Sequence, residues 1–119
     1  MSPGAAVERP WGSYEVLADA AAHSKVKYLT VHPGKRLSYQ SHAHRSEHWI
    51  VVQGEAEVLL DGVTHHLEAG DAIDVPVGTR HRCANPGDVD LVFVEVQRGE
   101  YFGEDDIERI ADDFGRAPA

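Results

Sequence analysis

The sequence has little cysteine, few basic residues and no long apolar run. Its 119 residues include one cysteine, Cys83, so an intramolecular disulfide is excluded and the thiol is expected to be a small buried group. Only 11 Lys and Arg accompany 20 Asp and Glu, and the formal charge of −9 disfavours nucleic acids and anionic membranes as partners. No stretch of about 18 apolar residues occurs, and no basic cluster precedes an apolar run at the N-terminus. We therefore expect a cytoplasmic protein with no signal peptide and no membrane contact.

Short alternations of apolar and polar residues, separated by turn residues, dominate the chain. In residues 55–58 (EAEV) the carboxylates take one face of a predicted strand and the apolar groups take the other. Asp61 and Gly62 separate two such runs and predict a tight hairpin. The predicted strands cover residues 13–17, 25–32, 36–44, 47–53, 55–60, 63–67, 72–75, 80–83 and 90–97. Many short strands with regular turns indicate an all-β sandwich or barrel.

The two ends of the chain differ from this β-rich middle. Residues 1–10 are rich in Pro, Gly and Ala and are expected to be a flexible tail, which leaves residues 11–119 as a single domain. Near the C-terminus, apolar residues recur at helical spacing: Ile107, Ile110, Ala111 and Phe114. Acidic residues precede this run and Gly115 follows it, so a short C-terminal helix is predicted over residues 105–114.

Histidine, amide and carboxylate side chains gather in two predicted strands. Gln40, His42 and His44 alternate along one strand and would share a face, and Glu47 follows after a short bend. His81 lies on a strand far along the chain. Imidazole nitrogens and carboxylate oxygens are ligands for zinc, iron, manganese and nickel, so these residues predict a divalent metal site inside the fold.

The spacing around these residues resembles the two motifs of the cupin superfamily. The second motif (Gly, five residues, Pro, one, Gly, two, His, three, Asn) is matched at every position, by Gly70, Pro76, Gly78, His81 and Asn85. The resemblance implies a single cupin β-barrel, which is a double-stranded β-helix of the jelly-roll type.

The first cupin motif fits only if one ligand is exchanged. Gly34 and Gly54 match its glycines, and Gln40 then stands where the motif has its first histidine. This frame implies four metal ligands: Gln40, His42, Glu47 and His81. The alternative frame, with His42 and His44 as the histidine pair, leaves only two residues before Glu47 and fits the motif less well.

A closer resemblance extends over almost the whole chain. Residues 9–12 (RPWG), 40–49 (QSHAHRSEHW) and 99–107 (GEYFGEDDI) are similar to the C-terminal cupin domain of type II phosphomannose isomerases, which is usually fused behind a mannose-1-phosphate guanylyltransferase domain. The resemblance implies a metal-dependent isomerase that interconverts mannose 6-phosphate and fructose 6-phosphate through an enediol and feeds polysaccharide biosynthesis. Zinc is the expected ion, ahead of manganese, cobalt, nickel or iron. We expect a free-standing domain without guanylyltransferase activity.

If the resemblance holds, residues around the metal take defined roles. His44, which the preferred frame leaves free, is the expected base, and Arg45 and Arg109 are the other expected catalytic residues. The phosphate of a phosphosugar substrate needs cations, and three are expected to bind it. These are Arg36, whose side chain would point inward because it is in phase with Gln40 and His42, Arg45 in the turn between the ligands, and Arg109 on the predicted C-terminal helix.

Two other functions remain open because cupins host many chemistries. One is a module that binds a metal or sugar without catalysis, and the other is an iron-dependent cupin oxygenase. A homodimer is also expected, because four large apolar residues are predicted near the sheet surfaces: Trp11, Trp49, Ile50 and Val52.

Overall fold

The computed structural model describes residues 6–19, 24–101 and 106–113, and these ranges fold into strands. The strands are β1 (Val7–Arg9), β2 (Gly12–Asp19), β3 (Ser24–Val31), β4 (Tyr39–Ser41), β5 (Arg45–Gln53), β6 (Glu55–Leu60), β7 (Val63–Glu68), β8 (Ala72–Val75), β9 (His81–Ala84), β10 (Leu91–Gly99) and β11 (Glu108–Ala111). Within the described part of the chain, no helix has the length and apolar character needed to cross a membrane.

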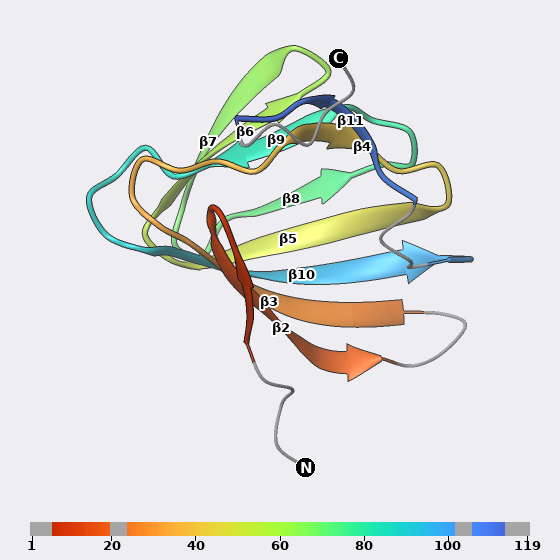
Figure 1. The fold of residues 1–119 in the computed structure, drawn as a ribbon, viewed down its shortest axis with the longest axis horizontal. Helices are drawn as coiled ribbons and strands as arrows, with labels where there is room; N and C mark the ends of the chain where they lie inside the picture. The colour runs from red at the N-terminus through yellow and green to blue at the C-terminus, as the bar shows by residue number, and fades with distance from the viewer. Residues whose placement is uncertain (1–5, 20–23, 102–105, 114–119) are drawn as a thin grey trace.

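Two antiparallel sheets face each other across the interior (Figure 1). One has the strand order β1-β2-β3-β10-β5-β8, and the other has the order β11-β4-β9-β6-β7. β5 and β6 are consecutive in the sequence but belong to different sheets, whereas β3 and β10 are distant in the sequence but pair directly. This is a jelly-roll arrangement, and the prediction of an all-β sandwich or barrel is confirmed.

The local patterns in the sequence are realised in the structure. Leu60 pairs with Val63 across a turn in which Asp61 and Gly62 have φ angles of 43° and 85°, as a tight hairpin turn requires, so the predicted hairpin is confirmed. Cys83 is 1% exposed, which confirms its role as a buried apolar group, and burial raises the pKa of its thiol.

The space between the sheets changes from apolar to polar along β3, β10 and β5. The inward-facing residues of one half of these strands are apolar: Leu29, Val31, Leu91, Phe93, Trp49 and Val51. In the other half they are polar and still buried: Lys27, Glu95, Gln97, Arg45 and Glu47. Burying so many polar groups is costly unless they are paired, so this half of the interior is a candidate for function.

The C-terminal segment is a strand where a helix was predicted. Glu108–Ala111 forms β11, which pairs with β4 at the edge of its sheet, so the helix prediction is wrong for these residues. Residues 105 and 114, at the ends of the predicted helix, lie outside the described residues. A segment this short gains little as an isolated helix because the first turn is costly to form, whereas the open edge of β4 offers hydrogen bonds at once.

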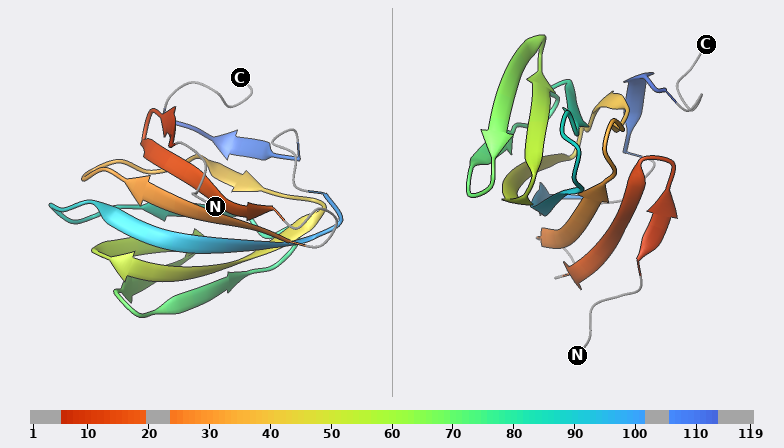
Figure 2. Two further views of the ribbon diagram at one scale, coloured as in Figure 1. Left: turned by 90° about the horizontal axis from the view of Figure 1, so that it is seen from below. Right: turned by 90° about the vertical axis from the view of Figure 1, so that its left-hand side faces the viewer.

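The expected N-terminal tail also contains regular structure. Val7–Arg9 forms β1, which pairs antiparallel with β2, while residues 1–5 lie outside the described residues. Figure 2 shows β1 on the same side of the molecule as β11, so two strands from opposite ends of the chain lie near one another. Arg9 of β1 and Arg109 of β11 both line a cavity at the polar half of the interior, Arg9 at its exposed rim.

Two of the four residues expected at a dimer surface belong to the core. Trp11 and Trp49 are 6% and 3% exposed, whereas Ile50 and Val52 are 41% and 50% exposed. The two tryptophans are therefore core residues: Trp49 follows the inward-facing alternation of β5, and Trp11 is buried in the turn between β1 and β2. The homodimer stays a prediction that now depends on Ile50 and Val52 alone.

Candidate metal centre

Three buried side chains converge in the polar half of the interior. His42, Glu47 and His81 each place one donor atom within 4.8 Å of the donor atoms of the other two. Nε2 of His42 lies 3.3 Å from Oε2 of Glu47. Two donors bound tetrahedrally to one zinc ion at about 2.0–2.1 Å would be separated by about 3.3 Å. The donor types and their spacing therefore fit a small divalent ion.

Backbone carbonyl groups determine which ring nitrogen of each histidine faces the cavity. Nδ1 of His42 lies 2.9 Å from the carbonyl oxygen of Asp106, and Nδ1 of His81 lies 2.9 Å from that of Thr79. A carbonyl oxygen can only accept, so each Nδ1 carries the hydrogen and each Nε2 presents its lone pair inward. Burial lowers the pKa of His42 despite the opposing charge of Glu47, which favours the neutral ring that a metal ion requires.

Glu47 is held at both of its carboxylate oxygens. Oε1 accepts a hydrogen bond from the Trp49 indole at 3.0 Å, and Oε2 accepts one from Nε of Arg45 at 2.9 Å. Burial alone would raise the pKa of Glu47, but His81, His42 and Arg45 together lower it below its usual value. The side chain is therefore an ionised carboxylate, the form that binds metal ions.

Arg45 contacts two of the candidate ligand atoms directly. Besides its bond to Oε2 of Glu47, its Nη2 lies 3.2 Å from Nε2 of His42. Arg45 was expected in the turn between the ligands, but it is the first residue of β5 and is 4% exposed. Its guanidinium therefore balances the charge of the cluster from inside the fold.

Gln40 and Arg109 lie in one row with His81 across the second sheet. Gln40 of β4 pairs with His81 of β9 on one side and with Arg109 of β11 on the other. Directly paired residues of neighbouring strands share a face, and all three line the same cavity as Glu47. Gln40 thus lies on the face from which an amide oxygen could join the ligand set, and its role as a ligand stays a prediction.

The cavity around the cluster is small and strongly charged. It encloses about 80 Å³ and is lined by four basic residues and two carboxylates: Arg9, Lys27, Arg45, Arg109, Glu47 and Glu95. Nε of Arg109 is buried and has no hydrogen-bond partner among the described residues. A half-buried guanidinium group with an unpaired N–H of this kind is suited to binding an anionic ligand.

His44 does not share the face of the candidate ligands. Its side chain is exposed and lies edge-on to Tyr101 with ring centroids 6.4 Å apart, and its backbone N–H donates to Oδ2 of Asp106 at 3.0 Å. β4 ends at Ser41 and β5 begins at Arg45, so strand alternation does not continue through His44. The expectation that it faces the metal site is therefore wrong.

Arg36 also lies away from the cavity. Its guanidinium is exposed and makes two hydrogen bonds, of 2.7 and 2.8 Å, to the carboxylate of Asp113. Only an isolated bridge to Ala84 pairs the backbone at Arg36, and regular strand begins at Tyr39. The backbone between Arg36 and Tyr39 is irregular, so the alternation that would have turned Arg36 inward does not reach it. The expectation that Arg36 faces the site is therefore wrong.

Sequence reasoning missed several residues that shape the site. Asp106 holds the loop before β5, because its carboxylate accepts bonds from the backbone of Ala43 and His44 while its carbonyl orients His42. Lys27 and Glu95 line the cavity and are in phase with inward-facing apolar residues of their own strands. That phase was visible in the sequence and could have identified both.

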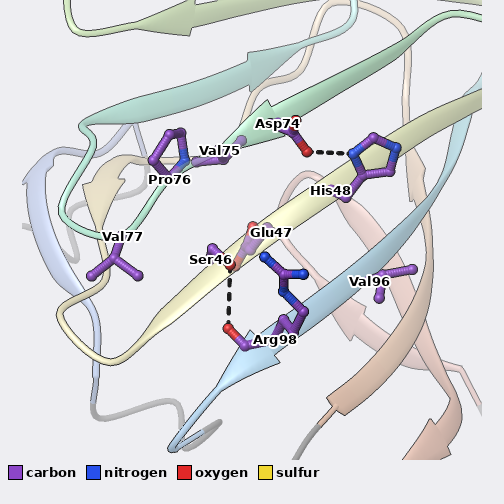
Figure 3. Close-up of a pocket in the computed structure, with 9 residues that line it drawn as sticks. All are labelled: Ser46, Glu47, His48, Asp74, Val75, Pro76, Val77, Val96 and Arg98. Carbon is purple, nitrogen blue, oxygen red and sulfur yellow. Dashed lines mark hydrogen bonds and ion pairs between the residues drawn. The ribbon is translucent and has the colours of Figure 1, made fainter.

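A larger hollow of about 660 Å³ lies beside the other face of β5. Figure 3 shows His48 and Asp74 pointing toward each other there, with Val77 and Arg98 elsewhere on the rim, and Nδ1 of His48 lies 2.5 Å from Oδ1 of Asp74. His48 follows Glu47 by one residue, so alternation turns it away from the cluster. The hollow includes neither candidate histidine ligand, so the smaller cavity is the candidate site.

Comparison with known families identifies the chain. The family model described as "Mannose-6-phosphate isomerase C-terminal" matches residues 3–112. The chain belongs to this family. The matched range includes all three convergent residues and both strands that carry the cavity-lining Arg9 and Arg109.

Curated relatives are considerably longer than this chain. The alginate biosynthesis protein AlgA of Pseudomonas aeruginosa is 51% identical over 110 residues, which cover 92% of this chain and 23% of the relative. A mannose-1-phosphate guanylyltransferase of Escherichia coli is 46% identical over 110 residues, with the same coverage of both chains. This chain therefore corresponds to about a quarter of each relative.

Solved structures share the fold at lower identity. The capsular polysaccharide assembling protein CapF of Staphylococcus aureus superposes with a TM-score of 0.82 at 20% identity, covering 93% of this chain and 35% of that one. The Cnp3 cupin domain of Schizosaccharomyces pombe superposes with a TM-score of 0.74 at 14% identity, covering 77% of this chain and 67% of that one. The fold is the cupin double-stranded β-helix, as the motif spacing implied.

Proposed function

We propose that this chain is a metal-dependent isomerase that interconverts mannose 6-phosphate and fructose 6-phosphate through an enediol. The observation that carries the proposal is the convergence of His42, Glu47 and His81 in a cavity lined by cations. Family membership supports the choice of substrate. The names of the relatives, which concern alginate biosynthesis and mannose 1-phosphate, support a role in polysaccharide biosynthesis.

The proposed metal ligands are Gln40, His42, Glu47 and His81. Two imidazole nitrogens, a carboxylate and an amide oxygen suit zinc first, and also manganese, cobalt, nickel or iron. A divalent ion bound there would polarise the sugar oxygens and stabilise negative charge that develops on them. Both histidines already present Nε2 to the cavity, so the rings need no reorientation to bind it.

Arg109 and Arg9 are the cations best placed for the phosphate group. Arg109 has an unpartnered buried Nε among the described residues, and Arg9 is exposed at the rim of the same cavity. Arg45 is engaged by Glu47 and His42, and Arg36 by Asp113. The cavity is smaller than the roughly 300–1,000 Å³ of most ligand pockets, so we infer that only the reacting end of the sugar enters and the phosphate stays at the rim.

The function is tested with the purified chain, mannose 6-phosphate and one divalent metal at a time. We expect fructose 6-phosphate to form with at least one of zinc, cobalt, manganese, nickel or anaerobically added iron, and to stop forming after chelation. Two histidines and a carboxylate are also the iron-binding set of non-haem oxygenases. The iron-loaded protein is therefore assayed for isomerisation without oxygen and for oxygen consumption in air. Stoichiometric metal binding without isomerisation above the no-protein control would instead favour a binding module.

Gln40 and His44 form a matched pair for testing the ligand set. Gln40→Ala should weaken metal binding by about 10-fold or more, because the proposed amide ligand, whose residue lines the cavity, is lost. His44→Ala should leave the affinity unchanged, because that ring lies outside on Tyr101. Isothermal titration calorimetry, with metal added to each metal-free variant, measures both affinities. The reverse order of effects would show that the alternative frame, with His44 as a ligand, is the right one.

A further inference from the structure

Glu95 is a buried carboxylate that the candidate ligand set does not use. It is 6% exposed and lines the same cavity as His42, Glu47 and His81. It does not belong to the convergent donor cluster found among the described residues. A buried acidic side chain that faces a cavity without joining its metal cluster needs another explanation.

We propose that Glu95 carries the proton between C1 and C2 of the sugar phosphate, a role that rests on the proposed isomerase function. It replaces His44 as the expected base. Among the residues that the structure describes, Glu47 and Glu95 are the two carboxylates that line this cavity. Glu47 is bound at both oxygens by Trp49 and Arg45, which leaves Glu95 as the acid–base group.

Strand register places Glu95 beside the metal cluster. Glu95 of β10 lies directly opposite Trp49 of β5, and Gln97 lies directly opposite Glu47. Glu95 and Glu47 are therefore diagonal neighbours on one face, a relation in which the backbones are about 7–8 Å apart and long side chains still meet. A sugar whose oxygens are held at the cluster would present its adjacent carbons to Glu95.

The surroundings of Glu95 hold it in place and balance its charge. The Gln97 side-chain amide donates to its Oε1, and Lys27 of β3 stands opposite it in the register. Burial, followed by the charge of Glu47, raises the pKa of Glu95 to about 8, against the opposing effects of Lys27, Gln97 and Arg45. In the metal-free protein both protonation states are therefore accessible near neutral pH, which suits a group that takes up and returns a proton.

The proton balance of the reaction can be written without a further reactant. The Glu95 carboxylate takes the hydrogen from C2, the electrons of that bond form the C1–C2 double bond, and the carbonyl electrons move to O1. This gives an enediolate and a protonated Glu95. One proton then passes from O2 to O1, and Glu95 returns its proton to C1 as the carbonyl forms at C2. The carboxylate is regenerated, and the sugar has changed from aldose to ketose.

The test compares Glu95→Gln with Glu57→Gln, a matched change on an exposed face of β6. With the metal-loaded full chain, Glu95→Gln should lower kcat by at least about 100-fold. Metal content and KM should stay near the wild-type values. Glu57→Gln should behave like wild type. In the metal-free protein, infrared difference spectra should show a carboxylic acid that titrates near pH 8 in the wild type and is missing in Glu95→Gln.

The outcomes separate this inference from the proposed function. Wild-type turnover that survives in Glu95→Gln would overturn the role of Glu95 and leave the isomerase proposal standing. The absence of turnover in metal-loaded wild type would overturn the isomerase proposal and the catalytic role together. Infrared spectra of wild type and Glu95→Gln that match throughout the titration would also count against Glu95. A large loss of kcat with intact metal content would support it.

Discussion

Replacing His81 with asparagine should remove the metal from the purified protein. His81 is 2% exposed, its Nδ1 donates to the carbonyl of Thr79, and its Nε2 faces Glu47 and His42. Asparagine keeps a polar group in the space but cannot place a nitrogen lone pair where the imidazole does. The loss of even a supporting group costs about 10–100-fold in metal affinity, so the loss of a direct ligand should exceed that.

His32→Asn is the matched control for this experiment. His32 is about half exposed and its Nδ1 lies 3.1 Å from Asp90, outside the cavity. Elemental analysis should find about one metal ion per chain in wild type and His32→Asn, and almost none in His81→Asn. Added metal should raise the Tm of the first two proteins only, because a ligand stabilises the state that binds it. Full metal content in His81→Asn would refute the ligand set.

The strands and the metal cluster were accessible to sequence reasoning because both depend on local rules. Alternation fixes which side chains share a face, and the Asp61–Gly62 pair fixes a hairpin. Motif spacing brought His42 and His81 into one hypothesis although 38 residues separate them. The structure places their donor atoms together with that of Glu47.

The errors arose where alternation was extended beyond a real strand. Residues 36–44 were read as one continuous strand, but regular pairing covers only Tyr39–Ser41. Arg36 and His44 lie on either side of it, and both turn away from the cavity. Irregular backbone resets which face a side chain takes, and the sequence contains no direct sign of where that happens.

The polar half of the interior could be predicted only with knowledge of which strands are neighbours. Lys27 and Glu95 each share the phase of the inward-facing apolar residues of their own strand, but they are far apart in sequence and nothing local shows that they meet. Pairing of β3 with β10 sets them opposite each other, and β5 adds Glu47 to the same face. Long-range strand pairing, rather than any local propensity, assembles this part of the site.

Replacing Arg45 with methionine should strongly destabilise the metal-free protein. Arg45 is 4% exposed, and it donates to Oε2 of Glu47 at 2.9 Å. Methionine fills similar volume but leaves the Glu47 carboxylate buried without its cation. Removal of one partner from a buried ion pair costs about 3–5 kcal/mol of unfolding free energy. Urea denaturation in the presence of a chelator measures the loss.

Arg36→Met is the control, because the guanidinium group of Arg36 also donates hydrogen bonds to a carboxylate. That pair, with Asp113, is exposed to solvent on both sides. Exposed ion pairs contribute about 0–1 kcal/mol, so this variant should remain close to wild type in stability. Equal losses in the two variants would show that burial of the Arg45–Glu47 pair has no special energetic importance.

Adding metal then distinguishes two causes of destabilisation in Arg45→Met, which are loss of the counter-charge and poor packing of methionine. In wild type, the ion and the Arg45 guanidinium compete for Oε2 of Glu47 and Nε2 of His42. In Arg45→Met the competitor is gone and the carboxylate lacks a counter-charge, so metal should bind more tightly and raise the Tm by more than it does in wild type. If the variant is destabilised only because methionine packs poorly, metal will raise both Tm values equally. A larger shift in Arg45→Met would show that Arg45 serves as the cation of the cluster when no metal is bound.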